Sequence, residues 1–168
     1  MSAALAVDGI LAALAAQLND AIDAIDARDN FELDKPAAGA YRAVTPGSEW
    51  PEWPTKPPCV WVGAQGWLGV DAAYWGQTGD LELVVAIGYA GANENDTTRR
   101  GLRYHEAIRR AIDAAVGAEP SDVVPGAYSV IVDPDPIITA VPGEGRRYWR
   151  FAQARVIVGL LTDRAEAA

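Results

Sequence analysis

The chain has 168 residues, half of them hydrophobic, and its 23 acidic residues outnumber its 14 basic ones, which gives a net charge of −9. This length is typical of one domain that can bury a core without disulfides or metals. The single cysteine excludes an intrachain disulfide framework, the single histidine disfavours a His/Cys metal site, and the negative charge disfavours nonspecific DNA binding. With no uncharged apolar stretch of about 20 residues and no basic leader, we expect neither a membrane span nor a secretory signal.

The charge is unevenly distributed along the chain. Residues 1–98 carry 4 bases and 14 acids, whereas residues 99–168 carry 10 bases and 9 acids. Twelve of the 14 bases are arginines, which either a coding bias or a role in contacts explains. The functional interpretation is a pair of unlike surfaces through which copies of the chain associate head to tail.

Residues 3–28 are predicted to form the first helix. Leucine, isoleucine and valine recur there at steps of three and four residues, and alanine supplies most of the remainder. Asp20, Asp23 and Asp26 follow a similar spacing on another face. That row is either a solvated helix face or an acidic surface that faces a partner or a lumen.

Residues 34–58 are predicted to form a loop excursion that is rich in proline and tryptophan. Dense prolines break helices and remove the donors of a sheet ladder, which leaves room for one short strand at residues 40–44. Trp50 and Trp53 stand in a polar stretch and need a surface to cover them. They either fold back onto their own core or dock on a neighbouring subunit, where tryptophan is a favoured anchor.

Residues 59–90 are predicted to form strands separated by a long loop. Residues 59–63 and 81–89 have strand patterns, and in the second the odd-numbered residues form one apolar face. Between them, residues 64–80 are rich in glycine and aromatic residues and look like a long loop or a ragged hairpin. That segment contributes Trp67 and Trp75 as further candidate interface residues.

Residues 96–116 are predicted to form the second helix, capped by Asn95 or Asp96 and ended by Gly117. Its predicted core face consists of Leu102, His105, Ile108, Ile112 and Val116. Arginines occupy the other sides, and the candidate interface residues among them are Arg99, Arg100 and Arg103.

Residues 127–161 are predicted to form the C-terminal strands. Strands at 128–132 and 137–139 flank a kink at residues 133–136, and a long strand covers 148–161 after a turn that carries Arg146 and Arg147, two more candidate interface residues. Short connections between such strands imply antiparallel pairing. The whole chain is therefore predicted to be one α+β domain, with a mostly antiparallel sheet of about four to five strands and two helices packed on one face.

No motif for catalysis, cofactor binding or metal binding emerges from the sequence. The pair His105-Glu106 lacks the second histidine of a zincin helix, and no nucleophile-elbow pattern surrounds any serine. Residues 143–147 lack the lysine of a phosphate-binding loop, and the residues around Asp133 and Asp135 do not fit a calcium loop. We therefore predict no catalytic residues, no cofactor and no metal.

The order of elements resembles a known family. Four features are similar to those of the tail terminator (tail-completion) proteins of long-tailed bacteriophages, of the lambda-like minor tail protein U type. They are the early helix with its apolar stripe and Asp row, the strand 60–63 before a long loop, the strand–turn–helix unit over residues 80–112 and the closing strand 149–161. The resemblance is one of layout and covers residues 3–162.

The resemblance implies a non-enzymatic virion protein of the tail or neck, assembled in the cytoplasm of a host bacterium. Such proteins form a homohexameric ring that caps the tail tube, stops its growth and offers the surface on which the filled head docks, so the expected partners are the tail tube protein and the head–tail connector or neck proteins. DNA passes through such a ring without specific binding, and no membrane partner is expected. The alternatives are a head-completion or neck protein, a small cytosolic α+β enzyme or ligand-binding domain, and a generic oligomeric binding module.

Overall fold

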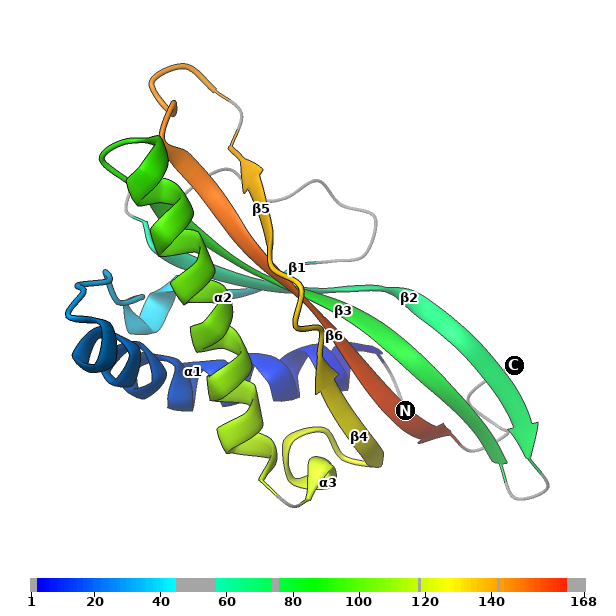
Figure 1. The fold of residues 1–168 in the computed structure, drawn as a ribbon. Helices are drawn as coiled ribbons and strands as arrows, with labels where there is room; N and C mark the ends of the chain where they lie inside the picture. Colours follow the sequence, from blue (N-terminus) through cyan, green and yellow to red (C-terminus); the bar gives the residue numbers. More distant parts are fainter. Residues whose placement is uncertain (1–2, 45–56, 74–75, 118, 142, 163–168) are drawn as a thin grey trace.

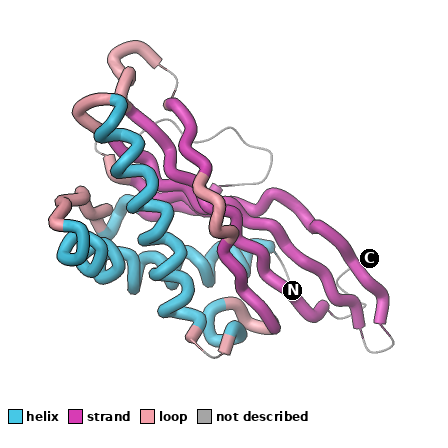
Figure 2. Tube along the Cα trace, viewed as in Figure 1, coloured by secondary structure: helices cyan, strands magenta, loops and turns pink. Residues whose placement is uncertain are grey.

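A computed structural model describes residues 3–44, 57–73, 76–117, 119–141 and 143–162. The elements follow in the order α1 (Ala3–Asp29), the 3-10 turn η1 (Ala38–Ala40), β1 (Tyr41–Val44), β2 (Cys59–Ala73), β3 (Gly76–Ala90), α2 (Glu94–Val116), α3 (Pro120–Val123), β4 (Ala127–Val132), β5 (Ile137–Ala140) and β6 (Trp149–Thr162). Both long helices lie on the same side of the sheet (Figures 1 and 2). The predicted α+β class with two helices on one face is confirmed, and α3 is a short addition.

The six strands form one sheet in the order β1-β2-β3-β6-β4, and β5 also pairs with β6. Only the pairing of β1 with β2 is parallel. The long strand β6 pairs with β3 along one side and with β4 and then β5 along the other. The predicted antiparallel pairing of the C-terminal strands, and the interruption at residues 133–136, are therefore confirmed.

The helix α1 forms because its apolar residues make one continuous stripe. Its nine buried residues face the sheet and α2. By length and composition alone this helix is able to cross a membrane. Its packing is that of the core helix of a folded domain, because the stripe is already covered by the sheet.

The core face of α2 differs from the predicted one. His105, Ile108 and Ile112 are buried as expected, whereas Leu102 is 48% exposed. Gly101 and Tyr104 are buried in its place. The helix comes so close to Tyr89 of β3 that position 101 needs a residue without a side chain. The predicted cap is also wrong: the Asn93 side chain accepts from the Asp96 amide at 2.9 Å, so the helix begins two residues earlier.

Of the two predicted forms of residues 64–80, the long loop is wrong and the ragged hairpin is confirmed. These residues extend β2 to Ala73 and begin β3 at Gly76, so that the two strands pair along their whole length. Register shifts between Ala64 and Gly66 and between Trp67 and Gly69 break the alternation of side chains. Because a strand is predicted from alternating apolar and polar residues, the two bulges make this part of β2 hard to predict from the sequence.

The two faces of the sheet are covered to different extents. The face toward the helices carries the main core. On the opposite face a smaller cluster of Cys59, Trp61, Ala86, Val141 and Phe151 is buried at one end. Both faces of β3 are therefore covered around Ala86, whereas Val84 is only half-buried.

Candidate functional site: the projecting arm

The sheet extends beyond its helices as an arm, formed by residues 65–73 of β2, 76–80 of β3 and 159–162 of β6. In Figures 1 and 2 this part of the sheet runs past the ends of both long helices. Backbone pairing between β2 and β3 is unbroken in its outer part, from Gly69 opposite Asp80 to Ala73 opposite Gly76, and contains two bulges nearer the helices. The arm is therefore regular structure that the helices leave uncovered.

Among the described residues of the arm, Trp67 is the aromatic one. It is 42% exposed and lies over Gly79, where an added Cβ would stand 2.9 Å from its ring. Its neighbour Leu68 is 52% exposed. The predicted interface residue Trp67 thus lies at a surface, whereas Trp50, Trp53 and Trp75 fall outside the described residues.

Three further exposed apolar residues lie in the arm or on β4 beside it, and none of them is among the predicted interface residues. Tyr128 and Ile131 of β4 are 52% and 58% exposed, and Leu161 of β6 is 48% exposed. Tyr128 lies over Gly159, and its hydroxyl stands 3.4 Å from the Asp80 carboxylate. The sequence pattern indicates that two of them are exposed, because Ile131 and Leu161 alternate with core residues and therefore face away from the helices.

Both sides of the sheet end in backbone edges that lack a partner strand. On one side β1 pairs only with residues 60–63 of β2, so among the described residues no strand continues along residues 64–73. On the other side β4 is the last strand of the sheet order. β4 and residues 64–70 of β2 contain no charged residue or proline, which commonly protect an exposed edge, whereas Asp71 and the bulges near Gly66 and Gly69 interrupt the β2 edge.

The arginines predicted for an interface on α2 surround Phe31, which follows α1. Their guanidinium carbons stand over its ring at 5.3 Å for Arg99, 5.6 Å for Arg100 and 4.2 Å for Arg103. Two of them also form ion pairs: Arg100 with Asp96 at 2.9 Å, and Arg103 with Asp29 at 3.0 Å. These contacts fix the end of α1 against α2, and only Arg99 of the three is exposed.

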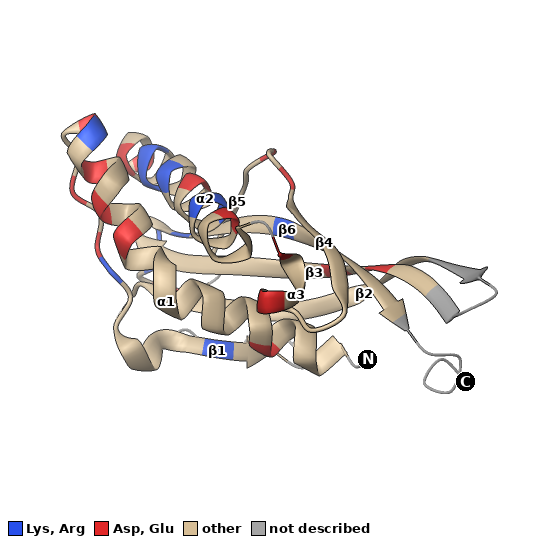
Figure 3. Ribbon diagram, turned by 90° about the horizontal axis from the view of Figure 1, so that it is seen from below, with Lys and Arg blue, Asp and Glu red and all other residues tan. Residues whose placement is uncertain are grey.

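Further ion pairs join the acidic first part of the chain to the more basic second part. Arg28 at the end of α1 contacts Glu106 of α2 at 2.6 Å, and this guanidinium lowers the pKa of both Asp29 and Glu106 through hydrogen bonds. Figure 3 shows the charged residues gathered on α2 and the C-terminal end of α1, with few on the strands. Several charges that the sequence offered for contacts between copies are therefore used within one chain.

The remaining predicted site residues lie in two other places. Arg146 and Arg147 precede β6 and stand over Trp149 and Tyr148, with guanidinium carbons at 5.3 Å and 5.2 Å from the ring centres. In the Asp row, Asp20 is exposed and Asp23 pairs with Lys35 at 2.5 Å.

Asp26 differs from the rest of its row. It accepts a hydrogen bond from the Leu33 amide at 2.9 Å, which fixes the chain after α1. Asp20 and Asp23 are therefore the exposed members of the row.

The residues with potential chemistry are isolated from one another. His105 is 5% exposed, and burial lowers its pKa. Cys59 is 2% exposed, and burial raises its pKa to about 11. Among the described residues no group of three or more His, Cys, Asp or Glu side chains is placed to hold a metal ion.

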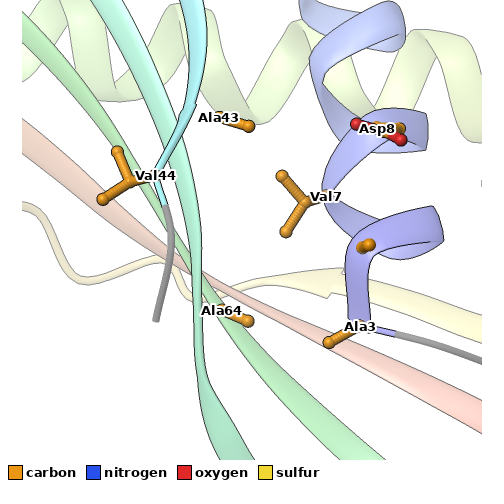
Figure 4. Close-up of a pocket in the computed structure, with 7 residues that line it drawn as sticks. Ala3, Val7, Asp8, Ala43, Val44 and Ala64 are labelled. Carbon is orange, nitrogen blue, oxygen red and sulfur yellow. The ribbon is translucent and has the colours of Figure 1, made fainter. Parts of the chain in front are cut away.

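Two of the hollows among the described residues illustrate the kind of site that the surface offers. The first, of about 230 Å³, lies between the start of α1 and the strands β1 and β2, and its lining is apolar except for Asp8. In Figure 4 Val7 points from α1 toward the strands across this hollow. The second, of about 260 Å³, is lined by α1, the end of α2 and α3, with Gln17 and Asp122 as its polar side chains. Neither brings together several polar groups, as a substrate site requires.

The sequence was compared with known proteins. No protein-family model matches the chain, and no curated protein is similar to it. The arm and the two sheet edges are thus the features on which a functional proposal rests.

Proposed function

We propose that the protein is a structural subunit of a ring that caps the tail tube of a long-tailed bacteriophage, ends tail growth and offers a docking surface for the filled head. The observation that carries this proposal is the arm. A long strand edge that is uncharged from residue 64 to residue 70, with Trp67 and Leu68 exposed on it, is a template for association with another chain. The resemblance in the order of elements supports the specific role.

The distribution of polar groups supports a role without catalysis. Enzymes place titratable groups together in a cleft, where burial and neighbouring charges perturb them. Here the perturbed carboxylates Asp29 and Glu106 are partners of Arg28 in an ion pair between helices. His105 is buried against Asp133, in the chain that follows β4.

The charge of the chain is compatible with the passage of DNA through such a ring. The net charge of −9 repels phosphate, and Asp20 and Asp23 are exposed carboxylates on one helix. We assign these two to the lumen as part of the proposal. A ring whose lumen is lined by Arg99–Arg110 instead would contradict this assignment.

The test measures the mass of the purified protein by light scattering over a range of concentrations, alone and with the tail tube protein of the same phage. A ring-sized species that binds tubes, and tubes that stop growing once it is added, are the expected results. Because some rings assemble only on their template, the sample with tubes is decisive. A protein that stays monomeric in the presence of tubes contradicts the proposal. Binding to the portal or adaptor protein, and not to the tube protein, would assign it to the neck.

A further inference from the structure

We infer that neighbouring copies of the chain join through their sheet edges, with β4 of one copy pairing with residues 64–73 of β2 in the next. The inference rests on the proposed function in one respect, namely that copies of this chain assemble. It adds which backbone segments form the contact and in which direction they run.

The two edges lie on opposite sides of one sheet and are different surfaces. β2 and β4 are separated by β3 and β6 in the sheet order. A contact between two different patches is heterologous, and repeated contacts of this kind generate a ring when the rotation closes. A chain with two unlike free edges therefore carries both halves of a head-to-tail contact.

The composition of both edges fits pairing with another strand. β4 is Ala-Tyr-Ser-Val-Ile-Val, six residues without charge, and residues 64–73 of β2 carry one charge, at Asp71, and two bulges, near Gly66 and Gly69. Proteins that keep edges apart place lysine, proline or inward-facing charges on them. Large apolar side chains flank both edges here: Trp67 and Leu68 at β2, and Tyr128 and Ile131 at β4.

The strand directions select the type of pairing. Each neighbouring pair from β2 through β3 and β6 to β4 is antiparallel, so β2 and β4 run in opposite directions. A rotation about an axis along the strands preserves strand direction from one copy to the next. In such a ring β4 meets the β2 of its neighbour as an antiparallel pair, which is the more stable type of ladder.

A second copy fits these edges better than an extended peptide from another protein does. A peptide added to the β2 edge would leave β4 with its backbone groups and Ile131 uncovered. One head-to-tail contact covers both edges at once, and each copy then presents the same pair of free edges to the next.

The first experiment introduces a charge at each edge. Leu68→Lys and Ile131→Lys place an ammonium group in the contact, whereas Leu102→Lys changes a leucine of similar exposure on α2 and is the matched control. We expect both edge variants to raise the concentration needed for assembly by about tenfold or more, because burying an unpaired charge is costly. Circular dichroism and thermal unfolding verify that each variant monomer is folded.

The second experiment tests proximity with a short bismaleimide crosslinker. The doubly substituted chain Leu68→Cys with Ile131→Cys should give a ladder of covalent oligomers, whereas each single variant should give none. The native Cys59 is 2% exposed and remains unreactive.

The outcomes separate the two proposals. If the edge variants assemble at the same concentration as the control, or if rings form but give no crosslinked ladder, the edge pairing is overturned. The proposed ring is not affected by either result. Covalent dimers from a single variant show a symmetric contact and also overturn it. A wild-type chain that does not assemble even on tubes overturns the proposed function and the pairing together.

Discussion

Replacement of Gly101 by alanine tests how closely α2 packs on the sheet. Alanine is favoured over glycine within a helix by roughly 1 kcal/mol, so propensity alone predicts a more stable protein. The structure predicts the opposite. A Cβ at position 101 would overlap the Tyr89 hydroxyl and lie 2.7 Å from Ile138 Cδ1.

Two costs oppose the gain in helix propensity. Overpacking of a core costs about 1–3 kcal/mol. The Tyr89 hydroxyl donates to the Thr97 carbonyl at 2.6 Å, and its displacement would leave a buried donor unsatisfied, at about 1–3 kcal/mol. Because Ile138 can rotate, we expect Gly101→Ala to lower the free energy of unfolding by about 2 kcal/mol.

Urea unfolding followed by circular dichroism measures this change. With a slope of about 2 kcal/mol per molar, the midpoint should fall by about 1 M. Gly39→Ala is the control, since an added Cβ there has open space around it.

A double-mutant cycle assigns the cause. In a Tyr89→Phe background the overlap with the hydroxyl is absent, so Gly101→Ala should be close to neutral there. A Gly101→Ala protein more stable than wild type by about 1 kcal/mol would show that α2 is not held at this distance, and would refute the packing argument.

The remaining predictions concern titration, reactivity and assembly. Because burial lowers the pKa of His105 below its ordinary 6.5, the unfolded chain binds more protons near that pH. Stability should therefore fall as the pH drops from 7.5 through 6.5, and in His105→Gln this component of the Tm profile should disappear; an unchanged profile would contradict the buried neutral imidazole. Cys59, with a pKa of about 11, should be alkylated by iodoacetamide at pH 8 about a hundredfold more slowly than in urea, and mass spectrometry that finds equal rates would refute its burial. Trp50→Ala combined with Trp53→Ala should weaken assembly without loss of the fold, whereas unfolding of that variant would show that both belong to the core.

Much of the fold is predictable from periodicity. The stripe of α1 and the odd-numbered face of β3 from Leu81 to Tyr89 are buried as predicted, because a long helix or strand must bury its apolar face to be stable. The interruption between β4 and β5 is also predictable, since two prolines cannot donate to the ladder. These features depend on neighbours along the chain, and a sequence displays such neighbours directly.

The candidate site was predictable only in part. The segment that contains Trp67 predicts either a long loop or a ragged hairpin, because the bulges around Gly66 and Gly69 break the alternation that would identify a strand. On α2, the exposed Leu102 and the buried Gly101 reverse the order of hydrophobicity. The distance between helix and sheet decides that reversal, and it depends on residues far away in the chain, such as Tyr89.

The sequence by itself determined the α+β class, through the order of its helix and strand patterns, and an acidic first part with a nearly neutral second part. Only the tertiary structure decided where those charges act: pairs such as Arg28–Glu106 and Arg155–Glu82 join the two parts within one molecule. Only the tertiary structure, likewise, placed residues 64–73 of β2 and β4 on opposite sides of the sheet, with no further strand beside them among the described residues. Strand order and long-range pairing arise from contacts between distant segments, so no local pattern in the sequence encodes them.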